Sequence, residues 1–354
     1  MIGKYLNDYT NSPPVPPGWS EWHAAAPNAQ RVYNWRLNNN GTITQYGQAP
    51  QDFKQDVLTE KTVGFIERRA PLQRPFFLWL NYTAPHDGDW GGAPVSYCQD
   101  ISAKPAPRHA HAFDSEPLPR PPNFNEADVS DKPGQIRNRS RLSSAQITDI
   151  QRKYRCQLES LLSVDEGVEK IVAALRAQAE LANTLVIFTS DNGFFNGEHR
   201  LPTGKEHIYE ESIRVPLQMR GPGIPQGVTV NALSINADLA PTIVDAANAT
   251  PGLAMDGRSL IPVAENPGIE QGRELLIENA RGLEQQPSFT AIRTQRYMYA
   301  EHAGGERELY DLAADPFELQ SRHNAPAYAS VRSQLASRLG QLRTCAGASC
   351  RTHP

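Results

Sequence analysis

The amino-acid sequence predicts an α/β fold, with a mostly parallel central sheet flanked by helices and a smaller antiparallel sheet near the carboxyl end. Two apolar runs, residues 76–82 and 184–189, each lead into a polar loop that contains glycine, as buried strands of a parallel sheet do. Between them, residues 144–175 carry apolar side chains at three- and four-residue steps, which predicts a long core-facing helix. Consecutive short strand candidates between residues 274 and 311 predict the second sheet.

Length and composition are those of a globular protein that can bury a large core. The chain has 354 residues, of which 39% are hydrophobic and 21% charged. Its net charge of −4 shows no electrostatic footprint for nucleic acid. No apolar run approaches the roughly 20 residues that a membrane-spanning helix needs. The first residues form neither a basic leader nor an apolar stretch, so we expect no membrane span and no signal peptide in this chain.

The four cysteines allow at most two disulfide bonds. Cys345 and Cys350 bracket four small residues, and we expect them to close a small loop near the carboxyl end. For Cys98 and Cys156 we expect free thiols, although they could form a second bridge. The sequence alone does not decide the connectivity.

The first part of the chain predicts one helix and one strand among irregular segments. Residues 1–50 are rich in Pro, Asn, Gly and Trp and predict irregular structure, with a turn or hairpin at Asn40-Gly41. A helix is expected over residues 56–69, where apolar side chains share one face, and prolines end it before the strand at 76–82. Residues 93–140 contain eight prolines and no periodicity, which predicts a long excursion over the surface or over a site.

The second part predicts a helix–strand alternation followed by a change of pattern. Ser143-Ser144-Ala145-Gln146 is similar to a capping box and opens the long helix. After the strand at 184–189 we expect a short helix at 207–213, a strand at 215–220 and a helix capped by Asp238. The later elements are strands at 274–278, 289–293, 297–301 and 308–311 and a terminal helix at 326–342. The change of pattern predicts an α/β domain over residues 1–265 and a smaller α+β subdomain over 266–354.

Candidate site residues follow the two apolar strands. Asp191 and Asn192 come directly after the second, and their hard oxygen donors suit Ca²⁺, or less well Mg²⁺, although Asp-Asn-Gly is also ordinary turn chemistry. His86 follows the first strand in the same way. A lone histidine after a strand is more often structural or solvated than catalytic, but this placement makes His86 a stronger site candidate than such a histidine usually is. His109 and His111 could bind a metal, but solvated loop histidines are the favoured interpretation.

Several short motifs are distributed along the whole chain. They are Gly3-Lys4-Tyr5-Leu6-Asn7, Ala84-Pro85-His86, Ser190-Asp191-Asn192-Gly193, Gly197-Glu198-His199-Arg200, Gly204-Lys205, Tyr209-Glu210-Glu211-Ser212-Ile213-Arg214-Val215-Pro216, Leu309-Tyr310-Asp311-Leu312 and Asp315-Pro316. With these motifs the chain resembles the sulfatases of the alkaline-phosphatase-like superfamily, closest to the N-acetylglucosamine-6-sulfatase type. The resemblance implies the alkaline-phosphatase-like sandwich, a sulfated saccharide or other sulfate ester as the substrate, and a secreted or periplasmic protein.

The resemblance also implies roles for individual residues. Asp191 and Asn192 would bind Ca²⁺, while Lys4 and Lys205 would bind the sulfate. His86 would hydrogen-bond the sulfate or protonate the leaving alcohol. A dication and two ammonium groups would stabilise the charge that spreads over the sulfate oxygens during transfer. Asn7, Glu198 and His199 would either contact the substrate or shape the loops around it.

One departure from the family pattern concerns the nucleophile. Sulfatases of this kind attack with a formylglycine made from the first residue of a Cys/Ser-x-Pro/Ala-x-Arg motif, and no Cys or Ser of these 354 residues opens that motif. In the family this motif and a pair of Asp metal ligands lie upstream of the Gly-Lys-Tyr-Leu-Asn segment. We therefore expect the carboxyl-terminal portion of a sulfatase, with a partial Ca²⁺ site and negligible turnover by itself, which an amino-terminal segment could complement.

Two other hypotheses remain open. The chain could be a non-catalytic protein that binds sulfated glycans through its lysines and His86. It could also be an enzyme with altered chemistry, in which a metal-activated water attacks phosphate or sulfate esters, but no residue here supplies the missing ligands.

Overall fold

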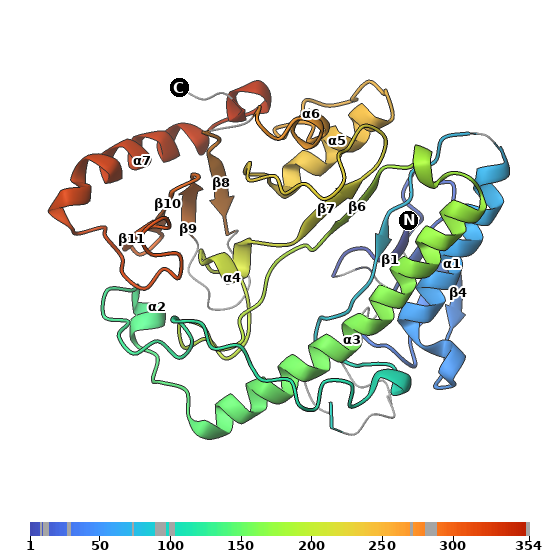
Figure 1. The fold of residues 1–354 in the computed structure, drawn as a ribbon, viewed down its shortest axis with the longest axis horizontal. Helices are drawn as coiled ribbons and strands as arrows, with labels where there is room; N and C mark the ends of the chain where they lie inside the picture. The colour runs from blue at the N-terminus through green and yellow to red at the C-terminus, as the bar shows by residue number, and fades with distance from the viewer. Residues whose placement is uncertain are drawn as a thin grey trace. The chain divides into compact units, whose positions relative to one another are not determined.

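A computed structural model describes residues 1–7, 9, 14–26, 30–72, 74–88, 97–98, 103–269, 272–279 and 289–351 (Figure 1). The chain divides into two compact units. The first consists of Met1–Leu118 and Thr148–Asn183, and the second of Pro119–Ile147 and Thr184–Pro354. Among the described residues, none of the helices combines the length and the apolar character that crossing a membrane requires.

The first unit is built around a five-stranded sheet with the order β4-β3-β2-β1-β5. Its strands are β1 (Ile2–Lys4), β2 (His23–Ala25), β3 (Arg36–Asn39), β4 (Thr42–Gln45) and β5 (Leu80–Asn81). β1 pairs in parallel with β2 and β5, whereas β2–β3 and β3–β4 are antiparallel. The predicted α/β class is confirmed, but this sheet is mixed rather than mostly parallel.

The prediction of irregular structure for residues 1–50 was wrong, because four of these strands lie there. Each is only three or four residues long, which is too short for an alternating pattern to stand out in the sequence. The expected hairpin is confirmed between β3 and β4. Asn40 and Gly41 both have positive φ, 51° and 95°, as a two-residue hairpin turn requires.

Two helices accompany this sheet, and both were predicted. α1 spans Lys54–Arg69 and α3 spans Ser144–Ala177, of which the part from Thr148 belongs to the first unit. Gly167 of α3 lies against Thr59 of α1 and Tyr82, whose hydroxyl groups are 2.6 Å apart. A Cβ at Gly167 would lie 2.5 Å from the Tyr82 hydroxyl oxygen, so the glycine permits this close approach.

Both cysteine pairs form disulfides. The terminal bridge, Cys345–Cys350, confirms the expectation. The expectation of free thiols at Cys98 and Cys156 was wrong, since these two buried residues are also bonded. The error has a simple cause: Cys156 lies on α3 and Cys98 lies 58 residues earlier, and nothing in the sequence shows that they meet.

The proline-rich segment, where it is described, contains only short elements. These are the 3-10 helix Pro107–His109 and the helix α2 (Gly134–Arg137), together with turns. Residues 93–96 and 99–102 lie outside the described residues. Other 3-10 helices are Pro50–Asp52, Ala70–Leu72, Leu181–Asn183, Asn236–Asp238, Pro326–Tyr328 and Gly347–Cys350.

In the second unit, β6 (Val186–Thr189) pairs antiparallel with β7 (Leu217–Arg220) as a two-stranded sheet. The interpretation of residues 184–189 as a buried, parallel strand was therefore wrong, and Phe188 is 40% exposed. The apolar run predicted a strand correctly but could not specify its partner. Besides α2, the described part of this unit contains the short helices α4 (Glu210–Ile213), α5 (Leu239–Ala246) and α6 (Ile261–Glu265).

A four-stranded antiparallel sheet, β11-β10-β9-β8, confirms the predicted carboxyl-terminal sheet. The strands are β8 (Leu275–Glu278), β9 (Phe289–Arg293), β10 (Tyr297–His302) and β11 (Arg307–Asp311). The predicted terminal helix is α7 (Ala329–Leu342), which lies along this sheet in Figure 1 and packs Leu335, Leu339 and Leu342 on one face of it. A second group of buried side chains from these strands packs with Phe195, Ile208 and Tyr209. Its members are Phe289, Ala291, Met298, Ala300 and Tyr310.

Candidate active site

The loop that follows β6 presents the two predicted metal ligands. Asp191 is exposed, and its Oδ1 accepts hydrogen bonds from the backbone N–H of Asn192, at 3.0 Å, and from the hydroxyl of Ser190, at 3.4 Å. The Asn192 side chain donates through Nδ2 to the carbonyl oxygen of Gly193, at 2.8 Å. This bond uses the amide nitrogen and leaves the amide oxygen, Oδ1, as an acceptor for other groups.

Lys205 lies beside this amide. Its Nζ donates a hydrogen bond of 2.9 Å to Asn192 Oδ1, and both side chains are half-buried. Gly204, directly before it, has a φ of 105°, a left-handed conformation that favours glycine. The structure therefore brings together two residues, thirteen positions apart, to which the sequence assigned metal binding and sulfate binding.

Helix α4 forms hydrogen bonds with the Asp191 loop and with the Lys205 loop. Ser212 accepts, at its carbonyl oxygen, a 2.8 Å hydrogen bond from the backbone N–H of Gly193. Its hydroxyl oxygen accepts a 2.9 Å bond from the backbone N–H of Glu206, next to Lys205. A Cβ at Gly193 would lie 1.9 Å from the carbonyl oxygen of Glu211, so only glycine allows this contact. The Tyr-Glu-Glu-Ser motif thus holds the Asp191 and Lys205 loops in place.

Two other predicted residues, Glu198 and His199, lie in the interior. His199 is fully buried and stacks on Tyr209 with ring centroids 4.0 Å apart. Glu198 accepts a 2.6 Å hydrogen bond from the backbone N–H of Asn196, and burial raises the pKa of Glu198. His199 and Arg200 have positive φ values of 50° and 63°, a conformation uncommon in residues other than glycine. His199 therefore lies in the interior of the second unit, in contact with Tyr209, and its predicted role at the substrate stays a prediction.

The first unit carries the remaining predicted residues. Lys4 is the last residue of β1 and is half-buried, and its carbonyl oxygen accepts a 2.8 Å hydrogen bond from Asn81 Nδ2 on β5. Asn7 is exposed in the turn that follows. Gly3 allows β1 and β5 to approach, since a Cβ there would lie 2.0 Å from the carbonyl oxygen of Asn81.

His86 follows β5 in an exposed bend. Its Nδ1 contacts the carbonyl oxygen of Asp87 and lies 3.2 Å from the carboxylate oxygen of the same residue. Both are acceptors, so Nδ1 carries the proton and Nε2 is the ring nitrogen with the lone pair. Because β1 and β5 are parallel neighbours, Lys4 and His86 follow the same edge of the sheet.

Sequence reasoning missed Lys54, the first residue of α1. Its side chain is fully buried, and burial lowers the pKa of its ammonium group well below the ordinary value, with the charge of Lys4 adding to the effect. Lys54 is therefore a site candidate, because strongly shifted pKa values are common at functional sites and Lys4 is a predicted substrate-binding residue. The helical pattern gave no signal for it, because its position at the start of α1 reads as a solvated polar residue.

The side chains after β6 are of the type that binds a hard dication, but they are too few to form a complete site. Asp191 supplies a carboxylate and Asn192 an amide oxygen, the ligand types that Ca²⁺ prefers. Two side chains are fewer than the roughly six to eight oxygen ligands of a Ca²⁺ site. His109 and His111, the alternative metal pair, instead contact separate carboxylates, Glu166 at 3.1 Å and Asp114 at 3.0 Å.

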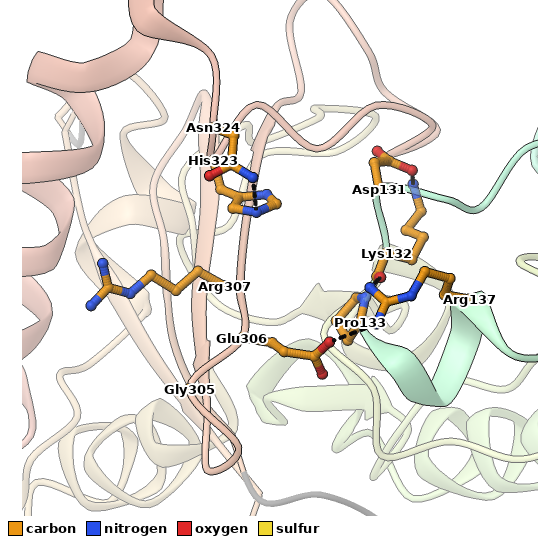
Figure 2. A pocket seen from close by; sticks show the side chains of 9 residues that line it. All are labelled: Asp131, Lys132, Pro133, Arg137, Gly305, Glu306, Arg307, His323 and Asn324. Carbon is orange, nitrogen blue, oxygen red and sulfur yellow. Dashed lines mark hydrogen bonds and ion pairs between the residues drawn. The ribbon is translucent and has the colours of Figure 1, made fainter.

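A pocket of about 260 Å³ lies elsewhere in the second unit (Figure 2). Glu306 points toward Arg137 there, at 3.3 Å, and the Asn324 amide lies 2.8 Å from a ring nitrogen of His323. These polar groups pair with one another, and the pocket contains none of the residues that the sequence predicted for a site. Its lining consists of Asp131, Lys132, Pro133, Arg137, Gly305, Glu306, Arg307, His323 and Asn324.

Comparison of the sequence with known proteins gives two family matches and several relatives. Residues 1–249 match the sulfatase family, and residues 197–345 match the carboxyl-terminal region of N-sulphoglucosamine sulphohydrolase. A putative extracellular sulfatase Sulf-1 homolog of Caenorhabditis elegans is 37% identical over 263 residues, covering 73% of this chain and 35% of the relative. N-acetylglucosamine-6-sulfatase of Bos taurus is 31% identical over 398 residues. That alignment covers 99% of this chain and 67% of the bovine protein, so this chain spans about a third to two thirds of these relatives.

Solved structures share the fold. One, in complex with its substrate D-glucosamine-2-N,6-O-disulfate, matches with a TM-score of 0.78 at 24% identity, over 97% of this chain and 78% of that chain. A phosphonate monoester hydrolase from Silicibacter pomeroyi matches with a TM-score of 0.66 at 22% identity, over 89% of this chain and 66% of that chain. The same fold therefore serves more than one kind of ester chemistry, and the fold by itself does not decide the substrate.

Proposed function

Because the chain belongs to the sulfatase family, we propose that it supplies the sulfate-binding residues and part of the Ca²⁺ site of a sulfuric-ester hydrolase for sulfated sugars of the glucosamine-6-sulfate type. The observation that carries this proposal is the 2.9 Å contact between Lys205 Nζ and Asn192 Oδ1. This contact supports the proposal because it joins the ammonium group proposed to bind sulfate to the loop proposed to hold the metal. The names of the bovine relative and of the sugar in the structural neighbour support the substrate class.

In this proposal Lys205 and Lys4 bind the sulfate oxygens. An ammonium group is a compact charge with three donors, and it suits an anion whose oxygens all carry negative charge. Lys205 is already oriented by its bond to Asn192, so little side-chain freedom remains to be lost when the sulfate binds. Asn7, exposed after β1, is assigned to the sugar.

His86 is proposed to donate a proton to the sugar oxygen that leaves. Asp87 accepts a hydrogen bond from Nδ1–H, so Nε2 is the ring nitrogen that binds the second proton and gives it to the leaving oxygen. An imidazole titrates near neutrality and can both give and regain a proton there. Its exposed position on the bend after β5 is compatible with contact to a bound ester.

Asp191 and Asn192 are proposed to hold Ca²⁺ as two of its oxygen ligands. The bound ion would supply positive charge at the sulfate oxygens. Asn192 Oδ1 is shared with Lys205, so the lysine and the metal loop are positioned as one group. The remaining ligands are not among the residues assigned here.

No residue of this chain fits the family's formylglycine, since the Cys/Ser-x-Pro/Ala-x-Arg motif is absent from the 354 residues. We therefore derive no hydrolytic step and propose that this polypeptide by itself has negligible turnover. The same observation favours one alternative, a protein that binds sulfated glycans without hydrolysing them. Extracellular relatives and two disulfides support secretion, because disulfides persist in oxidising compartments.

Calorimetric titration of the purified chain with glucosamine-6-sulfate, in the presence of Ca²⁺, tests the proposal. The expected result is binding that requires the sulfate, so that glucosamine does not bind. Lys205→Ala should weaken it by roughly 10- to 100-fold, because a hydrogen bond to a charged group contributes about 1.5–3 kcal/mol. The matched control is Lys170→Ala, since this lysine lies on α3, pairs with Glu60 and is 53% exposed, and binding should not change.

Turnover is measured on the same samples with an aryl sulfate and with glucosamine-6-sulfate. Robust hydrolysis would overturn the claim of negligible turnover. Absence of binding, or unchanged binding in a Lys4→Ala/Lys205→Ala double variant, would overturn the assignment of the sulfate site. Sulfate-dependent binding without hydrolysis supports the site and leaves the chain a binding protein under these conditions.

A further inference from the structure

Three ligand-type side chains converge in the second unit, apart from the Asp191 loop. His199, Glu211 and Glu318 each bring one nitrogen or oxygen atom to within 4.8 Å of the others, and we call them the His199 cluster. They come from three segments: the loop after β6, helix α4 and the turns after β11. His199 and Glu318 are fully buried, while the Glu211 side chain is 22% exposed.

The hydrogen bonds of His199 place its proton on Nδ1 and its lone pair on Nε2, the ring nitrogen that faces the cluster. Nδ1 lies 2.7 Å from Glu126 Oε2, which only accepts, so Nδ1 carries the proton. Nε2 then holds the lone pair, which accepts a 3.1 Å bond from Asn123 Nδ2 and faces Glu211 Oε2 at 3.9 Å. An imidazole whose other nitrogen donates to a carboxylate is the usual arrangement of a metal-binding histidine.

Both carboxylates of the cluster have an unused oxygen. Glu211 Oε1 accepts a 2.7 Å bond from Asn123, and Glu318 Oε2 accepts a 2.9 Å bond from the backbone N–H of Glu210. The second oxygen of each, Glu211 Oε2 and Glu318 Oε1, is buried and has no hydrogen-bond partner among the described residues. A buried oxygen of this kind is costly unless something charged or protic meets it.

The charges around the His199 cluster also favour a bound cation. Neighbouring carboxylates have cationic partners: Glu126 contacts Lys132 at 3.4 Å, and Glu210 contacts Arg293 at 2.8 Å. Among the described residues, no lysine or arginine forms an ion pair with Glu211 or Glu318. The ionised forms of these two carboxylates would lack compensation, and a single dication would supply it.

We propose that His199, Glu211 and Glu318 form a second divalent-metal site, distinct from the Asp191–Asn192 loop, that takes a borderline cation such as Zn²⁺. One imidazole nitrogen with two carboxylates suits Zn²⁺ better than Ca²⁺, which takes oxygen ligands alone. The bound ion has a structural role. It adds a second link between Glu318 and α4, beside the bond that Glu318 accepts from the backbone N–H of Glu210. Helix α4 in turn holds the Asp191 and Lys205 loops through Ser212.

A proton is the competing occupant of the same space. Burial raises the pKa of Glu318 well above its ordinary value, and the nearby carboxylates Glu210 and Glu211 add to the rise. A protonated Glu318 could satisfy the unused oxygens without any metal. The two occupants respond in opposite ways to Glu318→Gln: the amide removes a metal ligand, but it mimics a protonated carboxyl.

The experiment uses the full 354-residue chain carrying Asp191→Ala and Asn192→Ala, so that the loop after β6 does not contribute. The protein is stripped with a chelator, loaded with Zn²⁺, gel-filtered and assayed for bound metal and thermal midpoint. We expect about one equivalent of retained Zn²⁺ and a higher midpoint after loading. Adding Glu318→Gln should abolish both effects, and Glu126→Gln should weaken Zn²⁺ binding by roughly 10- to 100-fold through His199.

Glu306→Gln is the matched control, because this glutamate pairs with Arg137 away from the cluster, and Zn²⁺ retention should not change. Failure of the loop-deficient chain to retain Zn²⁺ would overturn the proposal, as would equal retention with Glu318→Gln. A midpoint equal to or above the parent in the metal-free Glu318→Gln variant, without Zn²⁺ uptake in the parent, would assign the site to a shared proton. If Glu318→Gln does not fold, Glu211→Gln decides by the same readouts, since this side chain is partly exposed.

Discussion

At the scale of single residues, His207 couples the stability of the Lys205 loop to pH. It is buried beside the rings of Phe195 and Tyr209. Burial lowers its pKa to about 4, and the charge of Arg139 contributes in the same direction. A histidine whose folded pKa lies below its unfolded value of 6.5 destabilises the fold as pH falls, because only the unfolded chain binds the proton between these values.

We therefore expect the free energy of unfolding to fall between pH 7 and pH 5, with about 2 kcal/mol of the loss due to His207. His207→Gln should remove this part of the slope, while the exposed His111→Gln serves as the control. Urea unfolding at the two pH values measures the difference. An unchanged slope in His207→Gln would show that His207 does not stay neutral in the fold.

The sequence predicted candidate site residues through their motifs, but it did not predict which of their side chains are in contact. Asp191, Asn192 and Lys205 lie within one motif region, and the structure brings Asn192 and Lys205 to 2.9 Å. The surroundings of His199 were not predictable, because Glu126 lies 73 residues earlier within a segment that has no periodic pattern. Glu318 follows the Asp315-Pro316 motif, which was the available signal, but the motif says nothing about what it packs against.

At the scale of elements, the contact of α3 with α1 depends on Gly167. In an exposed helix, Gly→Ala stabilises by about 1 kcal/mol through helix propensity. At Gly167 the new Cβ would lie 2.5 Å from the Tyr82 hydroxyl and 2.6 Å from the Thr59 hydroxyl. Overpacking of this kind costs roughly 1–3 kcal/mol, so Gly167→Ala should lower the thermal midpoint.

Gly340→Ala is the matched control for this helix prediction. Gly340 lies in α7, is exposed, and has no atom within 4 Å of the added Cβ, so this variant should keep or raise the midpoint. Both variants replace a helical glycine by alanine, so the difference between their midpoints excludes the general preference of helices for alanine. A Gly167→Ala variant at least as stable as Gly340→Ala would show that α3 and α1 do not approach as closely as described.

Elements with a long repeat were predictable, and short ones were not. Residues 144–175 present many apolar positions at helical spacing, so α3 could be located almost to its ends. The strands of residues 1–50 contain three or four residues each and offer no period to detect. β6 was recognised by its apolar run, but such a run does not tell a parallel partner from an antiparallel one.

At the scale of the whole molecule, the sulfatase fold followed from motifs spread over the chain, whereas the division into parts did not. The boundary at residue 265 remains a prediction. Within the second unit, side chains on both sides of that boundary share one core. Phe195, Ile208 and Tyr209 pack with buried residues of the four-stranded sheet, among them Met298 and Tyr310.

This shared core predicts that residues 1–265 will not fold without residues 266–354. Removing the sheet would expose Phe195, Ile208 and Tyr209, each worth about 1.5–3 kcal/mol when buried, and the sum rivals the roughly 5–15 kcal/mol net stability of a domain. Expressed alone, residues 1–265 should aggregate, whereas a chain ending at residue 343 loses only the segment after α7 and should stay soluble. Gel filtration and near-ultraviolet circular dichroism measure both. A soluble 1–265 fragment with native near-ultraviolet signal would mean that the two parts are independent domains, and that α4 and its loops hold their positions without the carboxyl-terminal sheet.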